Sequence, residues 1–392
     1  MNPLLKPCEE RLQTVTKRRS LRIGLPREDG TEETRMPLTP QAVEVLVAQG
    51  HTVVIETLAG SEARFSDRQY TDAGAQMVSQ HAQAFDADIV LKLSLPTTDE
   101  LQHVRDKQTL IAFVTRHNRS ADIYKALAQK ECNIIALDFI SDGDDEEPVV
   151  TRCLGELEGM LAITTAARLL ERTNGGKGII IGGVTGVPPT EIIILGAGMS
   201  ALCAARTALA LGALVRVFDN HHSNLQKMAQ QLPHHVFTSI LHPQALSKAM
   251  VSADVIIGMH AIPGEYQYCV EEDVIRLMKR GAIAIDLNAT SGVRFETSTP
   301  TSLQQPIYIR DNVIHHCLPD ITMLAPHTAT IVISDIITPI IGELAEFGNL
   351  TETIKNYSGV SRGTVMFRGV TTNRYVAGRF GTEYYNIALL II

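Results

Sequence analysis

The stretch IIILGAGMSALCAARTALALGALVRVFDN, residues 192–220, has the layout of a strand, a tight glycine turn, a helix and a second strand. Gly196, Gly198 and Ala201 form the pattern GxGxxA between an apolar run and an alanine-rich helix. The first glycine permits the turn, the second lets a pyrophosphate approach the backbone, and the alanine lets helix and strand pack closely. Free N–H groups at the start of this helix, at Met199, attract phosphate. The stretch therefore predicts a dinucleotide-binding βαβ unit.

The acidic residue that ends the second strand indicates which dinucleotide binds. Asp219 follows Gly196 by 23 positions, near the spacing at which an acid accepts a hydrogen bond from the ribose 2′-hydroxyl and repels a 2′-phosphate. We therefore predict NAD as the cofactor, although Arg216 and Asn220 lie nearby and weaken the preference over NADP.

Later strands of the same unit are expected to end beside the cofactor, because ligands of open parallel sheets lie outside the carboxyl ends of the strands. The runs DVIIGMH and AIAIDLN end in this way. We place Gly258, Met259, His260 and Leu287 there. His260 is open to two interpretations: it transfers a proton, or, as is commoner at this position, its backbone contacts the cofactor.

The rest of the chain from Leu21 alternates short β-branched runs with amphipathic helical stretches. This alternation is typical of parallel sheets that are covered by helices on both faces. We expect an α/β protein of two doubly wound, Rossmann-like domains with a cleft between them. The predicted substrate domain comprises residues 1–153 plus 345–392, and the predicted NAD-binding domain comprises residues 154–344 with linking helices.

Two helices of the first domain are predicted from local signals. TPQAVEVLVAQG predicts a helix with Thr39 as N-cap, Pro40 at the first position and Gly50 after its end. SDRQYTDAGAQMV is also expected to be helical.

Composition excludes several classes of protein. A hydrophobic content of 45% with 20% charged residues is that of a soluble globular protein, and a net charge of −8 argues against a nucleic-acid surface. TIVISDIITPIIGEL contains Asp335 and Pro339 and is expected to be too short for a membrane span. The six cysteines form no CxxC pair, so we expect neither a metal site nor a disulfide framework, and a cytoplasmic protein.

The chain resembles the alanine dehydrogenase and transhydrogenase α-subunit family over nearly its whole length from residue 21. The resemblance rests on RIGLPRE, TRMPLTPQAVEVLVAQGHTVVIE, ADIVLKL, NGGKGIIIGGVTGVPPTEIIILGAGM, ADVIIGMHAIPG, MKRGAIAIDLN and VIHHCLPD. The C-terminal GVTTNRYVAGRF is similar to an alanine dehydrogenase branch. The resemblance implies a two-domain, NAD-dependent, hexameric enzyme that oxidises L-alanine to pyruvate and ammonium.

The resemblance also implies where the substrate binds. The family's carboxylate-binding arginine falls on Arg35, whose planar guanidinium suits a carboxylate. Its substrate lysine falls on Ser94, its catalytic histidine on Thr115 and its aspartate on Thr290, while Asp320 stands where the family carries asparagine.

Two nearby residues are predicted to replace the missing groups. Lys92 lies two positions before Ser94, hence on the same side of a strand, and His117 lies two positions after Thr115. We interpret Lys92 as a cation in the substrate site and His117 as the acid–base group. The alternatives are that Lys92 is a non-reacting lysine and that His117 caps a loop.

Three functions remain open at this point. The chain is interpreted first as an NAD-dependent amino-acid dehydrogenase with rearranged catalytic groups, acting on an amino acid or a 2-oxo acid. The alternatives are a transhydrogenase-like NAD(H) module and a non-catalytic NAD-binding protein. We choose the dehydrogenase because of the similarity along the chain and because Arg35 is present.

Overall fold

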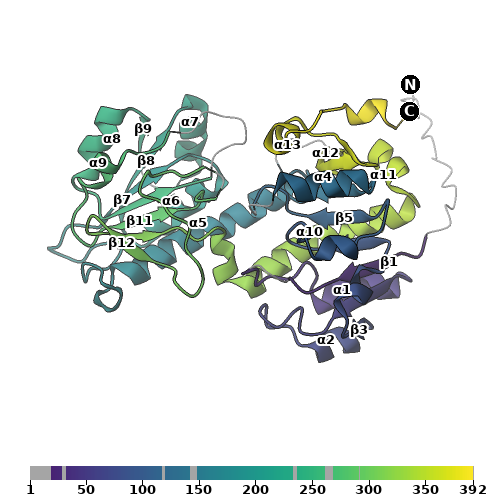
Figure 1. Ribbon diagram of the computed structural model, residues 1–392. Helices are drawn as coiled ribbons and strands as arrows, with labels where there is room; N and C mark the ends of the chain where they lie inside the picture. Colours follow the sequence, from purple (N-terminus) through teal and green to yellow (C-terminus); the bar gives the residue numbers. More distant parts are fainter. Residues whose placement is uncertain are drawn as a thin grey trace, which may run out of the picture.

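The computed structural model describes residues 19–28, 32–116, 120–141, 148–232, 236–260, 268–290 and 292–391. It consists of two α/β lobes that are joined by the long helices α5 (Val149–Leu170) and α10 (Pro326–Glu346), as Figure 1 shows. The second of these helices returns the chain to the lobe in which it began, so the C-terminal residues lie with the N-terminal ones.

The first lobe is built on a sheet with the strand order β3-β2-β1-β4-β5-β6, all parallel, and β14 and β15 extend it antiparallel beyond β6. Its strands are β1 (Arg22–Leu25), β2 (Thr52–Glu56), β3 (Gln76–Val78), β4 (Ile89–Leu91), β5 (Thr109–Ala112), β6 (Asn133–Ala136), β14 (Thr364–Phe367) and β15 (Val370–Thr371). The order reverses between β1 and β4, so the residues after these two strands flank the crevice where ligands bind in such sheets.

Helices cover both faces of this sheet. They are α1 (Pro40–Ala48), α2 (Asp67–Asp72), α3 (His81–Phe85), α4 (Ala121–Gln129), α11 (Leu350–Asn356), α12 (Ser358–Gly363) and α13 (Arg374–Phe380), with 3₁₀ turns at Glu100–Gln102 and Ile387–Leu389. Helix α1 begins as predicted, because the Thr39 side chain accepts a hydrogen bond from the Ala42 N–H and Pro40 occupies the first turn.

The second predicted helix is wrong in its C-terminal half. Gly74 adopts a φ of 94°, which ends the helical region, and Gln76–Val78 form the edge strand β3. A run of only three strand residues has too few side chains to show a period of two, so the sequence pattern did not separate it from the helix.

The second lobe repeats the same doubly wound order. Its strands are β7 (Glu191–Leu195), β8 (Leu214–Asp219), β9 (Phe237–Ile240), β10 (Val255–Gly258), β11 (Ile283–Asp286), β12 (Tyr308–Arg310) and β13 (Val313–His316). The order is β9-β8-β7-β10-β11-β13, all parallel, with β12 antiparallel at the edge. The predicted α/β class with two Rossmann-like domains is confirmed.

The helical elements of this lobe are α6 (Met199–Ala210), α7 (His222–Gln231), α8 (Pro243–Met250) and α9 (Glu272–Ile275), with 3₁₀ turns at Arg172–Asn174 and Ile321–Leu324. Helix α5 packs tightly against α6, which is possible because Gly159 has no side chain. A Cβ atom there would overlap the backbone at Ser200 and Ala204. This close approach places Glu158 of α5 at the N-terminus of α6.

Helix α10 corrects the expectation that its sequence is too short for a membrane span. It extends over 21 residues and has the length and apolar composition of such a span, while half of its most apolar window is buried inside the protein. Ile333, Ile337 and Ile341 belong to the core of the first lobe. Its apolar character therefore matches that of a core helix.

Candidate functional site

The glycine turn of the second lobe leaves its backbone open. Gly196 has a φ of 111°, a conformation that L side chains rarely adopt. Gly198 is the N-cap of α6 and makes no side-chain capping bond, and a Cβ atom built on it would meet nothing within 4 Å. Behind the turn, Ala201 is fully buried in the core of the lobe. The first turn of α6, beginning at Met199, thus presents unobstructed N–H groups of the kind that bind phosphate.

Asp219 lies beside this turn at the end of β8. Its Oδ2 accepts a hydrogen bond from the Ala197 N–H at 2.9 Å, and its Oδ1 accepts one from the His221 N–H at 2.8 Å. These two bonds fix the carboxylate, and the remaining lone pairs are able to accept hydroxyl groups. The residues around the turn therefore fit a dinucleotide: backbone for the pyrophosphate and a fixed carboxylate for a ribose.

The end of β10 is packed by an arginine that the sequence analysis did not consider. A Cβ atom on Gly258 would lie 2.5 Å from the Cβ of Arg294, so glycine is needed here for packing. The Nε of Arg294 donates to the Met259 carbonyl at 2.7 Å and Nη2 donates to the His260 carbonyl at 3.4 Å. Met259 and Leu287 are each 2% exposed. Their side chains thus belong to the core of the second lobe, beneath the ends of β10 and β11.

In the first lobe, titratable side chains gather where β1, β2 and β4 end. We call this group the strand-end cluster; its members are Glu28, Glu56, His81, Lys92 and Glu100. The buried Lys92 ammonium lies 2.9 Å from Glu100 and 3.1 Å from Glu28. The His81 ring contacts Glu56 at 2.6 Å through Nδ1 and Glu100 at 3.0 Å through Nε2.

Electrostatic interactions in the strand-end cluster favour the charged forms of His81, Lys92 and Glu100. The hydrogen bonds that the His81 ring donates to Glu100 and Glu56 raise the pKa of His81 to about 9. Burial opposes ionisation of Glu100, yet the hydrogen bond from His81 and the charge of Lys92 lower its pKa to about 2. Burial also opposes the charge of Lys92, but Glu28 and Glu100 outweigh it and raise the lysine pKa.

Two residues at the family's catalytic positions are held by neighbouring carboxylates. The Ser94 hydroxyl donates to Glu28 at 2.6 Å. The Thr115 hydroxyl donates to Asp138 at 2.7 Å, and the Thr115 N–H donates to the same carboxylate at 3.1 Å. Both hydroxyl groups therefore serve local structure in this conformation.

A second group of charges crosses the junction between the lobes. We call it the interlobe cluster; its members are Glu33, Arg35, Arg116, Glu158, His260 and Asp320. The loop that carries Arg35 is docked on the second linking segment, since Thr34 Oγ1 donates to the Met323 carbonyl at 3.0 Å and the Met36 N–H donates to Thr330 at 2.9 Å.

Arg35 is fully engaged within this cluster. Its Nε and Nη2 donate to the two oxygens of Glu33 at 2.7 and 2.6 Å, and Nη1 donates to Asp320 at 2.8 Å and to Thr322 at 2.6 Å. The side chain has no exposed surface. Arg35 was predicted to bind a substrate carboxylate. Its Nε–Nη2 edge, which suits a carboxylate, is occupied by Glu33.

Arg116, Glu158 and His260 continue the cluster into the second lobe. Arg116 Nη1 donates to Glu158 at 2.8 Å and to Asp320 at 3.2 Å. Glu158 also accepts a hydrogen bond from the Ser200 hydroxyl at 2.8 Å and lies 3.6 Å from His260 Nε2. The cluster therefore reaches from the first-lobe loop to the N-terminus of α6.

Mutual pairing sets the protonation states in the interlobe cluster. Burial disfavours the charge of Glu158, but His260 and Arg116 lower its pKa to about 2. Burial likewise opposes the charge of Asp320, and the two arginines drive its pKa well below the usual range. Glu158 outweighs burial at His260 and raises its pKa. These pairings therefore favour the ionised forms of Glu158, Asp320 and His260.

The structure places the predicted catalytic residues in two separate groups. Lys92 belongs to the strand-end cluster and Arg35 to the interlobe cluster, whereas His117 lies outside the described residues. The sequence analysis missed Glu33, Arg116 and Glu158 as partners. A signal existed for Glu158, because it lies in the segment GELEG of an otherwise apolar helix. An acid that such a helix buries needs a cation as its partner.

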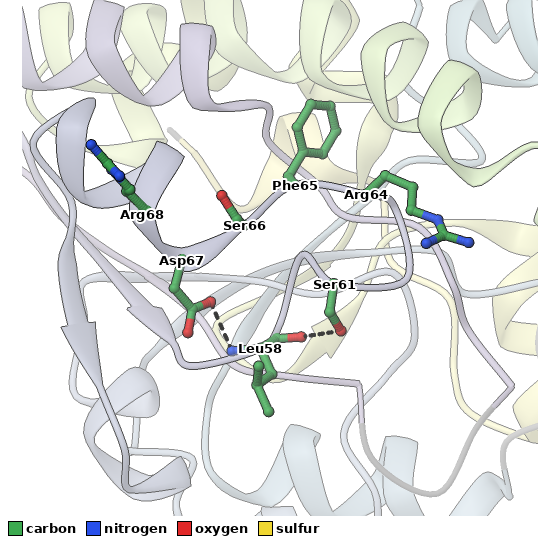
Figure 2. A pocket seen from close by; sticks show the side chains of 7 residues that line it. All are labelled: Leu58, Ser61, Arg64, Phe65, Ser66, Asp67 and Arg68. Carbon is green, nitrogen blue, oxygen red and sulfur yellow. Dashed lines mark hydrogen bonds between the residues drawn. The ribbon is translucent and has the colours of Figure 1, made fainter.

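One hollow of about 490 Å³ lies apart from both clusters, in the loop between β2 and α2. Figure 2 shows its lining, which consists of Leu58, Ser61, Arg64, Phe65, Ser66, Asp67 and Arg68. Asp67 accepts from the Leu58 N–H at 2.9 Å and Ser61 donates to the Leu58 carbonyl at 2.8 Å, so the loop is held by its own hydrogen bonds. None of the predicted site residues lines this hollow.

Comparison with known proteins decides the family. The profile "Alanine dehydrogenase/PNT, N-terminal domain" matches residues 24–151, and "Alanine dehydrogenase/PNT, C-terminal domain" matches residues 162–374. The chain belongs to the alanine dehydrogenase/PNT family. Within this family it is 32% identical to Alanine dehydrogenase 2 of Staphylococcus aureus over 369 residues, which is 94% of this chain and 98% of the relative.

Solved structures of the alanine dehydrogenase/PNT family agree with this assignment. An L-alanine dehydrogenase matches 92% of this chain and 99% of its own with a TM-score of 0.83 and 29% identity. A transhydrogenase from Sinorhizobium meliloti matches 90% of this chain and 99% of its own with a TM-score of 0.74 and 21% identity, a likeness in fold. The predicted family is confirmed, and membership supports an oxidoreductase that uses NAD.

Proposed function

We propose that the protein is an NAD-dependent amino-acid dehydrogenase that converts L-alanine or a related amino acid, NAD and water to a 2-oxo acid, ammonium and NADH. The observation that carries the proposal is the open backbone at Gly198 beside the fixed Asp219, in a chain that resembles Alanine dehydrogenase 2 over nearly all of its length. Gly198 and the first turn of α6 hold the pyrophosphate, and Asp219 accepts hydrogen bonds from the ribose hydroxyls. NAD, when bound, supplies the hydride acceptor.

The chain's own residues then bind and orient the amino acid. Oxidative deamination needs cations for the carboxylate and a group that moves a proton at the amine and at the attacking water. Arg35 and Lys92 supply positive charge on the first-lobe side. We propose an imidazole as the proton carrier: His117 as inferred from the sequence, with His260, the one-third exposed histidine of the interlobe cluster at the end of β10, as the alternative.

The arrangement of the molecule follows the same proposal. We assign residues 1–153 plus 345–392 to substrate binding and residues 154–344 to NAD binding. Gly196, Ala201, Gly258, Met259 and Leu287 shape the nucleotide region from behind, because these positions are packed or conformationally required. We further propose a cytoplasmic homo-oligomer, with a hexamer suggested by the family resemblance.

A second candidate function is a catalytically lapsed NAD-binding protein. The hydrogen bonds that tie Ser94 to Glu28 and Thr115 to Asp138 favour it, since the groups at these two positions are engaged in local structure. The two candidates share the cofactor and differ only in turnover, so one assay separates them.

The experiment measures NADH binding first and turnover second. Calorimetry with NADH tests the cofactor, and loss of nicotinamide absorbance with ammonium and a panel of 2-oxo acids tests the dehydrogenase. Turnover that disappears in an Arg35→Ala variant supports the enzyme. NADH binding without turnover on any 2-oxo acid supports the lapsed protein, and absence of NADH binding at millimolar concentration refutes both.

A further inference from the structure

The two arginines of the interlobe cluster use their guanidinium groups differently. In Arg35 every nitrogen donates to a side chain of the protein, and Glu33 fills the paired Nε–Nη2 edge. In Arg116 a single nitrogen, Nη1, donates to both Glu158 and Asp320. Within the described ranges, Nε and Nη2 of Arg116 have no hydrogen-bond partner. The edge that suits a carboxylate is therefore filled in Arg35 and open in Arg116.

Arg116 also lies in the right place and is held rigidly. It follows β5, on the side of the sheet where β1 and β4 mark the ligand crevice, and it joins both lobes through Glu158 and Asp320. Its guanidinium carbon lies 5.1 Å from the centre of the Phe113 ring, which supports one face. Its side chain is 9% exposed, whereas that of Arg35 has no exposed surface.

We propose that Arg116 binds the carboxylate of the substrate through its Nε–Nη2 edge and that Arg35 is a positioning residue, which holds Asp320 against Arg116. This inference rests on the proposed dehydrogenase function and names the group that selects its substrate. A planar guanidinium clamped at Nη1 presents two parallel N–H donors, and this geometry recognises a carboxylate with both oxygens.

The charge balance limits the substrate to one carboxylate. The cluster holds the acids Glu33, Glu158 and Asp320 against Arg35, Arg116 and His260, so beyond the open edge of Arg116 it offers no surplus positive charge to a substrate. A second carboxylate would need another cation, yet Lys92 is already paired with two acids. The substrate class is therefore monocarboxylic amino acids and 2-oxo acids, with dicarboxylic ones disfavoured.

The test compares Arg116→Lys with Arg35→Lys, because lysine keeps the buried charge but cannot offer two parallel donors. Pyruvate is titrated into NADH-saturated protein, followed by nicotinamide fluorescence, and steady-state rates are measured with pyruvate and ammonium. For Arg116→Lys we expect Kd and KM for pyruvate to rise about 30-fold while kcat changes less than about threefold. This pattern indicates the loss of a contact that is equally strong in the bound substrate and in the transition state. NADH affinity and melting temperature should stay near those of the wild type.

Arg35→Lys should instead affect stability more than substrate binding. We expect a lower melting temperature than for Arg116→Lys and a smaller rise in KM for pyruvate. Arg105→Lys, an exposed arginine paired with Asp86, is the matched control and should leave every value unchanged. A larger rise in KM for Arg35→Lys than for Arg116→Lys would overturn the assignment. So would tighter binding of 2-oxoglutarate than of pyruvate by the wild type.

Failure of this inference can be told apart from failure of the proposed function. If the wild type binds NADH but no 2-oxo acid at tens of millimolar, the carboxylate site at Arg116 is refuted while the cofactor site stands. If NADH does not bind, the dehydrogenase is refuted, and calorimetric titration of pyruvate into the protein alone still decides whether Arg116→Lys weakens an anion site.

Discussion

The nucleotide turn and the interlobe cluster are built from opposite materials. The turn at Gly196 and Gly198 is backbone without side chains: the Gly196 and Ala197 N–H groups are bonded to Phe218 and Asp219, and the backbone at Gly198 is unobstructed. The interlobe cluster is made of long charged side chains, buried and paired with one another across the two lobes. The turn thus lacks side chains that would obstruct a ligand, whereas in the cluster most of the charge is already neutralised by acids and bases of the chain itself.

This difference determines how each region responds to substitution. Adding a side chain at Gly198 obstructs the ligand without disturbing the protein, because a Cβ atom there meets nothing within 4 Å. Removing a side chain from the cluster leaves a charge buried without its partner, which destabilises the fold before it affects any ligand. NADH affinity therefore reports on the turn, and the free energy of unfolding reports on the buried charge pairs of the cluster.

The largest effect is expected for Asp320→Ala. This change removes the shared partner of Arg35 and Arg116, and loss of one partner of a buried pair costs about 3–5 kcal/mol. Urea denaturation measures the free energy of unfolding. Asp320→Asn keeps the shape and part of the hydrogen bonding and should lose less; equal stability of the alanine variant and the wild type would contradict the buried network.

The next effect concerns Gly198→Val. Nothing lies within 4 Å of the added Cβ and the backbone is extended, so the melting temperature should be unchanged. The side chain would enter the space of the pyrophosphate, and we expect NADH affinity to fall about 100-fold, which corresponds to about 2.7 kcal/mol. Calorimetry measures it. Gly342→Ala, at another open glycine, is the control, and tight NADH binding by Gly198→Val would place the nucleotide elsewhere.

A smaller effect is expected from the pH dependence of the strand-end cluster. The pKa of His81 is raised from 6.5 to about 9, so its stabilising contribution is complete below pH 6.5 and is lost as the pH rises through 9. The melting temperature should fall over this interval in the wild type and less so in His81→Gln. His222→Gln, at an exposed histidine, should follow the wild type. Identical profiles for His81→Gln and the wild type would show that the imidazolium does not stabilise the cluster.

The smallest effect is expected for Asp219→Ser. The change removes the carboxylate that binds the ribose hydroxyls and repels a 2′-phosphate. NADH affinity should fall about tenfold, or about 1.4 kcal/mol, and the preference for NADH over NADPH should narrow. Fluorescence titration with both nucleotides measures this ratio. An unchanged ratio would mean that Asp219 serves only to hold the turn through Ala197 and His221.

The sequence predicted those features that depend on neighbouring residues. The capped helix at Thr39 and the strand–turn–helix around Gly196 appear where the local signals put them. The edge strand at Gln76–Val78 was missed because its short run carries no period.

The candidate site likewise has a part that local sequence predicts and a part that only the tertiary structure shows. Local spacing along the chain specified the turn and Asp219, because a pyrophosphate is bound by consecutive N–H groups and one strand end. No spacing reveals that Arg35 is saturated by Glu33 and Asp320, or that Arg116 keeps one edge open. The pairings of Arg35 and Arg116 with Asp320 join residues more than 200 positions apart, and buried charges take whichever partners the packed lobes bring within hydrogen-bonding distance.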